Sequence, residues 1–136
     1  MKIILEGPTQ QSVFNHARSG TNIVVRSVDN AVHLEFKDDN CMSASVQFCD
    51  QEIDAFCQSL PSRGDDWHRG AVSFNDHYMV LSVSRTTFGE PFEECIMFCV
   101  TEANTKKQWD ERQISVCLDF GSRDCFIEAI RVLYNN

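Results

Sequence analysis

Short runs of alternating apolar and polar residues constrain the fold of this chain more than any other feature of its sequence. In one such run, Val32, Leu34 and Phe36 alternate with polar or small residues. Successive side chains of a β-strand point to opposite faces, so this pattern predicts strands with one buried face. Strands are predicted at residues 23–28, 31–36, 42–48, 70–75, 77–86, 93–101 and 112–120. Residues 6–20 show the least pattern.

Two segments change from a period of two to helical spacing. Apolar residues of 50–60 recur at Ile53, Phe56, Cys57 and Leu60, and Pro61 ends the segment. A second apolar stripe, over 122–134, predicts a C-terminal helix. The expected fold class is α+β: a mostly antiparallel twisted sheet of about six or seven strands with two helices, at about 50–60 and 122–134, packed on it. The length of 136 residues fits a single domain, 1–136.

The charge balance is strongly acidic, with twenty Asp and Glu against twelve Lys and Arg and a formal net charge of −8. Such a chain repels nucleic-acid phosphates and anionic membranes, so we expect a basic protein partner, no direct nucleic acid and no membrane. The apolar run 3–5 is shorter than the roughly 7–15 residues of a signal peptide. We therefore expect a cytoplasmic protein.

Seven cysteines, at 41, 49, 57, 95, 99, 117 and 125, leave three interpretations open. A disulfide framework is typical of secreted chains and of even cysteine numbers. A zinc site would need close pairs, but Cys95 and Cys99 on one strand lie about 13 Å apart. We favour reduced cysteines that act as small apolar residues, with no metal and no cofactor, over metal binding or redox chemistry.

Motifs of catalysis do not support an enzyme. The sequence contains no G-x-S-x-G elbow, phosphate-binding loop or H-E-x-x-H motif. His33 and Glu35 share the polar face of a predicted strand, where they resemble a base and its orienting group, but exposed strand faces commonly carry such residues. A small Cys-dependent enzyme stays open as an alternative, because any of the cysteines could pair with a histidine.

The acidic residues fall in clusters, largely in predicted turns. Carboxylates in turns steer a basic partner toward a protein, although they also serve solubility. A tryptophan in a polar loop is a further candidate contact, since Trp is enriched in interface hot spots. The predicted partner-binding residues are Asp38, Asp39, Asp65, Asp66, Trp67, Glu90, Glu93, Glu94, Asp110 and Glu111.

Three stretches of the chain resemble a group of small bacterial α+β domains that includes WapI-type toxin immunity proteins. They are the strand and helix over 42–60, the tryptophan-bearing loop and strands over 66–83, and the final strand and helix that follow Trp109. The resemblance implies a protein without catalytic residues that binds and neutralises a partner protein. The abundant cysteines depart from the pattern of that group.

The favoured hypothesis is therefore a non-enzymatic acidic protein that neutralises a partner by occlusion, as an immunity protein against a bacterial toxin does. One alternative is an anti-defence inhibitor from a mobile element, which would present carboxylates where phosphates bind. Another hypothesis is a homodimer formed through strand 93–101, because that strand is apolar on both faces.

Overall fold

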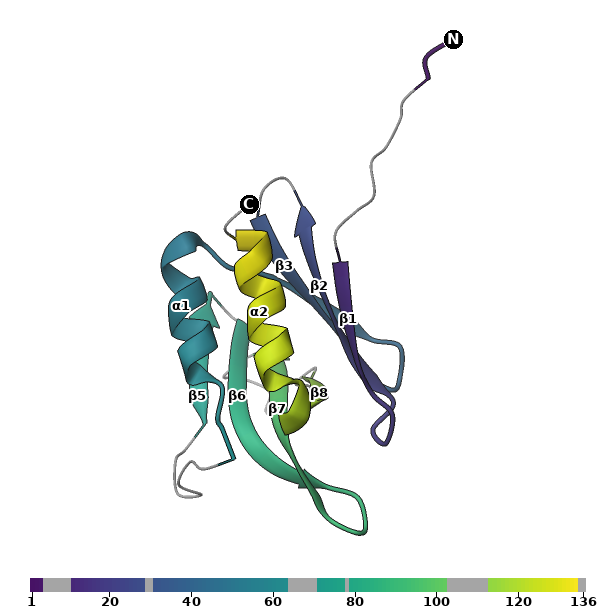
Figure 1. Cartoon of the computed structure of the whole chain (residues 1–136), viewed down its shortest axis with the longest axis vertical. Helices are drawn as coiled ribbons and strands as arrows, with labels where there is room; N and C mark the ends of the chain where they lie inside the picture. The colour runs from purple at the N-terminus through teal and green to yellow at the C-terminus, as the bar shows by residue number, and fades with distance from the viewer. Residues whose placement is uncertain (4–10, 29–30, 64–70, 78, 103–112, 135–136) are drawn as a thin grey trace.

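The computed structural model describes residues 1–3, 11–28, 31–63, 71–77, 79–102 and 113–134. These residues form two four-stranded antiparallel sheets, and each sheet is followed along the chain by a helix (Figure 1). The predicted α+β class is confirmed. The prediction of one sheet with six or seven strands is wrong, because strand pairing stops at the first helix and starts again after it.

The first sheet has the strand order of the sequence: β1 (Gln11–His16), β2 (Thr21–Val28), β3 (Ala31–Lys37) and β4 (Ser43–Gln47). Its buried face is the alternating apolar face that the sequence predicts. Strand β1 lies in the segment that shows little pattern. Its inward positions are Ser12, Phe14 and His16, so only one of the three is apolar, while Val13 points outward and is 48% exposed.

The second sheet contains β5 (Val72–Asp76), β6 (Met79–Phe88), β7 (Glu93–Glu102) and β8 (Gln113–Asp119), again in chain order. On β7 the inner face carries Ile96, Phe98 and Val100, all buried. Cys95 on the opposite face is also buried, whereas Met97 and Cys99 are half-buried. Strand β7 is therefore covered on both faces only near its beginning.

The two helices lie side by side on the sheets (Figure 1). Helix α1 (Asp50–Ser59) is joined to α2 (Arg123–Tyr134) by an ion pair between Asp54 and Arg131, with 2.9 Å between Oδ1 and Nη1. A short 3₁₀ turn, η2 (Phe120–Ser122), precedes α2. Cys49 stands at the N-cap position of α1. No helix among the described residues is long and apolar enough to span a membrane.

Phenylalanines from both sheets and both helices form the centre of the core. Phe36, Phe56, Phe98 and Phe126 are all fully buried. The ring of Phe98 lies 5.4 Å from that of Phe36, 5.9 Å from Phe56 and 5.7 Å from Phe126, measured between centroids. Each such ring contributes about 3–5 kcal/mol relative to alanine. This cluster therefore holds the two sheets and two helices together.

Candidate functional site

Three turns meet at one end of the molecule, at the lower right of Figure 1. They join β1 to β2 (residues 17–20), β3 to β4 (38–42) and β6 to β7 (89–92). The structure thereby brings together five acidic residues that the sequence placed in separate clusters. We call this group the acidic end: Asp38, Asp39, Glu90, Glu93 and Glu94.

Arg18 joins the β1–β2 turn to the β6–β7 turn. Its Nη1 donates to Oε2 of Glu93 at 3.1 Å, and its Nη2 donates to the carbonyl oxygen of Pro91 at 3.0 Å. The guanidinium lies directly over Gly89, where an added Cβ would collide with it. Gly89 also has a φ of +76°, which glycine adopts without steric cost. This contact fixes where the tip of the β6–β7 hairpin lies.

The β3–β4 turn touches the β1–β2 turn from the other side, since a Cβ added to Gly20 would lie 3.5 Å from the Cβ of Asp39. Within the turn, Oδ1 of Asp38 accepts hydrogen bonds from the backbone N–H groups of Asn40 and Met42, at 3.0 and 2.9 Å. Asp38 therefore holds the shape of this turn, as carboxylates commonly do.

The remaining acids of the acidic end differ in what they contact. Glu94 pairs with Arg85, at 2.9 Å between Oε2 and Nη2, and the Arg85 guanidinium carbon lies 5.2 Å from the centroid of the Phe120 ring. Asp39 and Glu90 are exposed. Between Glu90 and Glu93 lies Phe92, whose 78% exposure is unusual for a large apolar side chain. The side chains of Asp39, Glu90 and Phe92 are therefore free of the ion pairs described above and exposed to a binding partner.

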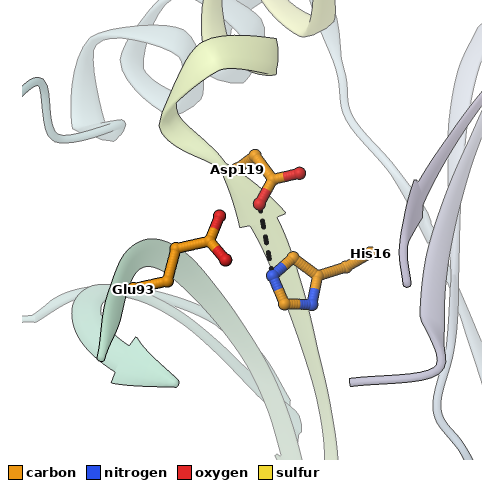
Figure 2. A group of neighbouring side chains, drawn as sticks. All are labelled: His16, Glu93 and Asp119. Atoms are coloured by element: carbon orange, nitrogen blue, oxygen red, sulfur yellow. Dashed lines mark ion pairs between the residues drawn. The ribbon is translucent and has the colours of Figure 1, made fainter. Parts of the chain in front are cut away.

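At the base of the acidic end, His16, Glu93 and Asp119 come from three different strands and point toward one another (Figure 2). His16 is 3% exposed, and its Nε2 lies 3.2 Å from Oδ1 of Asp119. The three potential ligand atoms lie within 4.8 Å of one another. Such a set of one imidazole and two carboxylates is a candidate metal centre.

The pKa values of the two carboxyl groups of this cluster shift in opposite directions. Burial, together with the neighbouring Glu93 carboxyl, raises the pKa of Asp119. The hydrogen bond from Arg18, together with one from Asp119, lowers the pKa of Glu93. Asp119 is thus the carboxyl that gains a proton first, and it can donate that proton to the charged Glu93.

The hydrogen bonds of His16 argue against a metal ion at this cluster. The backbone N–H of Ser19 donates to Nδ1 of His16 at 3.1 Å. Because Nδ1 accepts, the ring proton belongs on Nε2, from which it is donated to Asp119. A metal would need the lone pair of Nε2. The arrangement therefore binds the β1–β2 turn to strand β8, as a structural hydrogen bond.

Ser19, His16 and Asp119 also resemble a serine-protease triad in their order of contacts. The Ser19 Oγ lies 2.7 Å from Nδ1 of His16, but it also lies 2.7 Å from Oγ1 of Thr21. Thr21 in turn accepts a hydrogen bond of 3.1 Å from the backbone N–H of Cys117. The hydroxyl is thus held inside a chain of hydrogen bonds that connects the β1–β2 turn to β8, which does not favour a nucleophile.

The cysteines near this turn are reduced and largely inaccessible. Cys95 and Cys117 are buried, and all seven cysteines are free. A hydrogen bond with the Cys117 thiol is the main cause that raises the pKa of Cys95, and burial is the second. The same hydrogen bond lowers the pKa of Cys117. The interpretation of reduced cysteines that act as small apolar residues agrees with the buried Cys57, Cys95 and Cys117, and not with the exposed Cys41, Cys49 and Cys125.

Other residues singled out in the sequence lie apart from this end or outside the described residues. Glu35 contacts Arg26 at 3.0 Å and Lys37 at 3.2 Å, which makes it an ion-pair partner. Five predicted contacts fall outside the described residues: Asp65, Asp66, Trp67, Asp110 and Glu111. The sequence did not point to His16, Arg18 or Phe92. A phenylalanine between two acidic residues was the available signal for Phe92.

The fold and the site define an α+β protein built from two antiparallel sheets, each followed by a helix. Among solved structures, the chain is similar to the crystal structures of Trypanosoma brucei MRP1/MRP2, with a TM-score of 0.53 and 13% sequence identity. The match covers 94% of this chain and 82% of that chain, and at this identity it shows the fold alone. No protein-family model matches the sequence, and no curated protein matches it.

Proposed function

We propose that this protein binds a basic partner protein through the acidic end and neutralises it by occlusion, as an immunity protein neutralises a toxin. The observation that carries the proposal is that two acid-bearing turns, 38–42 and 89–92, both contact the β1–β2 turn, and that the second of them carries the exposed Phe92. The sequence resemblance to WapI-type immunity proteins points to the same function.

Charge supports the choice of partner. The five carboxylates of the acidic end outnumber the two guanidinium groups, those of Arg18 and Arg85, that pair with them. The chain as a whole carries a formal charge of −8. Complementary charge accelerates association with a basic protein and disfavours acidic ones. Asp39 and Glu90 are the acids best placed for this steering.

Phe92 supports binding rather than solubility alone. An exposed aromatic ring has no role in keeping a protein soluble, whereas aromatic residues commonly dominate binding energy at the centre of an interface. A charged rim around an apolar anchor is the usual organisation of protein–protein contacts. Phe92 with its acidic neighbours has this organisation on a small scale.

The test is binding to the protein encoded beside this gene, measured as association and dissociation rates at low and high salt. We expect Asp39→Lys with Glu90→Lys to slow association about tenfold or more at low salt, with a smaller effect at high salt. We expect Phe92→Ala to cost about 2 kcal/mol, mainly through faster dissociation. Each variant should also lose protection when co-expressed with the partner.

A matched control reverses the same number of charges elsewhere. Asp124→Lys with Glu128→Lys alters two exposed acids of α2, away from the three turns, and should leave both rates unchanged. An equal effect of the two charge reversals would show that only net charge matters. Absence of binding to the neighbouring gene product would contradict the immunity function itself.

A further inference from the structure

A cleft lined by apolar and polar side chains lies between the two sheets, on the side away from the contact of β8 with the first sheet. Its volume is about 340 Å³, within the range of ligand pockets. It lies between β4, the last strand of the first sheet, and β5, the first strand of the second. Phe48 and Phe74, whose ring centroids are 6.3 Å apart, lie among its lining residues. The cleft thus has an aromatic floor between two sheet edges.

Both strands that border the cleft are open edges. Among the described residues, no strand pairs with the outer side of β4 or of β5. Natural edge strands are commonly protected by lysine, proline or a bulge. The only charged residue in these two strands is Asp76, at the end of β5. An extended segment that enters the cleft could therefore pair with backbone groups and cover apolar side chains at once.

The lining residues also indicate the charge of an occupant. Glu52 and Asp76 are the charged residues that line the cleft in the described part of the chain, where no lysine or arginine lines it. The hydrogen bonds of Cys49 lower the pKa of Glu52, so this carboxylate stays ionised in mildly acidic solution. An apolar strand that carries a positive charge fits these features.

The beginning of this chain has the same composition. Met1 and Ile3 are, with Phe92, the most exposed large apolar side chains of the described residues, and Lys2 lies between them. In an extended conformation Met1 and Ile3 would point to one side and Lys2 to the other. This places apolar groups toward the cleft and the ammonium group toward its rim.

We propose that the cleft between β4 and β5 receives the segment 1–3 of a second copy of this chain, so that the protein forms a homodimer. Met1 and Ile3 pack over the aromatic side chains of the cleft, and Lys2 approaches Asp76. In a symmetric dimer each copy donates one segment and accepts one, so both clefts are filled. The inference is independent of the proposed function, because the acidic end does not contribute to this interface.

Light scattering over a range of concentrations tests the proposal with the full chain. We expect a dimer, and we expect deletion of residues 2 and 3 or the substitution Ile3→Asp to raise its dissociation constant at least tenfold. Val132→Asp is the matched control, because Val132 is a half-exposed apolar residue on α2 outside the cleft. Circular dichroism checks that each variant stays folded.

A charge exchange separates this interface from others. Lys2→Asp should weaken the dimer, and adding Asp76→Lys should restore it, an effect that loss of structure would not give. A weak dimer has a dissociation constant on the order of 100 µM. A full chain that stays monomeric at about 200 µM would therefore overturn the proposal. Ile3→Asp could leave the dimer intact while a substitution of Met97 breaks it. That result would place the interface on strand β7 and would also overturn the proposal.

Discussion

Gly89 is the residue on which the acidic end depends most directly. Its φ of +76° and the guanidinium of Arg18 above it both exclude a side chain. We expect Gly89→Ala to lower the free energy of unfolding by about 1–2 kcal/mol, through backbone strain and displacement of Arg18. Gly121→Ala is the control, since nothing lies within 4 Å of a Cβ there. Urea unfolding of both variants measures the difference, and equal stabilities would contradict the role of Gly89.

Residue chemistry explains why sequence alone identified only part of the site. Glu93 and Glu94 were recognisable as neighbouring acids at the start of a predicted strand. The pairing of His16 with Asp119 was not, because these residues are far apart in the sequence and meet only when the β1–β2 turn lies against β8. Asp38 was also predicted as a contact, but hydrogen bonds within its own turn occupy one of its oxygens. Local sequence does not reveal such competition.

The stability that Glu52 contributes at the start of helix α1 depends on pH. Oε1 of Glu52 accepts a hydrogen bond of 3.2 Å from the N–H of Cys49. Hydrogen bonds from Cys49 lower the pKa of Glu52 in the folded state, so its contribution is present above the ordinary value of 4.5 and disappears as the pH falls below it. We expect Glu52→Ala to cost about 0.5–1 kcal/mol at pH 7.

The control for this prediction keeps the hydrogen bond and removes the charge. Glu52→Gln should retain much of the stability at pH 7, and its stability should change less between pH 6 and pH 3 than that of the unmodified protein. Chemical unfolding at each pH measures both. A pH dependence of Glu52→Gln that equals that of the unmodified protein would show that the carboxylate of Glu52 does not contribute.

Strands with an apolar alternating face were predictable, and strands without one were not. The pattern over 112–120 agrees with β8, and the pattern over 42–48 agrees with β4. Strand β1 was not predicted because two of its three inward residues are polar, and one of them, His16, is buried through its contact with Asp119. The helices were predicted to within one or two residues, because helical spacing, Pro61 and the preceding strand mark their limits.

At the scale of the whole molecule, burial predicts the reactivity of the thiols. Cys41, Cys49 and Cys125 are exposed, whereas Cys57, Cys95 and Cys117 are buried. Burial raises the pKa of Cys57 and contributes to the raised pKa of Cys95. We expect a thiol reagent at pH 7.5 to modify the three exposed thiols first and all seven only after unfolding. A single thiol that reacts far faster than the others would instead support a Cys-dependent enzyme.

The arrangement of the strands as two sheets could not be read from the sequence. Alternation shows which residues face the core, but it does not show whether the strands before and after α1 pair with each other. Here they do not, and β4 and β5 remain as edges of separate sheets. The element order of four strands and a helix, repeated once, has no counterpart in repeated sequence, because apolar residues of many kinds fill the same core.

The hydrogen bond from the Cys117 amide to Thr21 has a consequence for how this end of the protein opens. Strand β8 is an edge, and this amide would exchange its hydrogen with water if the β1–β2 turn lay elsewhere. Its exchange rate therefore records the fraction of time that the turn is lifted. A bound partner that holds the turn in place would slow that single amide, even though it touches neither Cys117 nor Thr21.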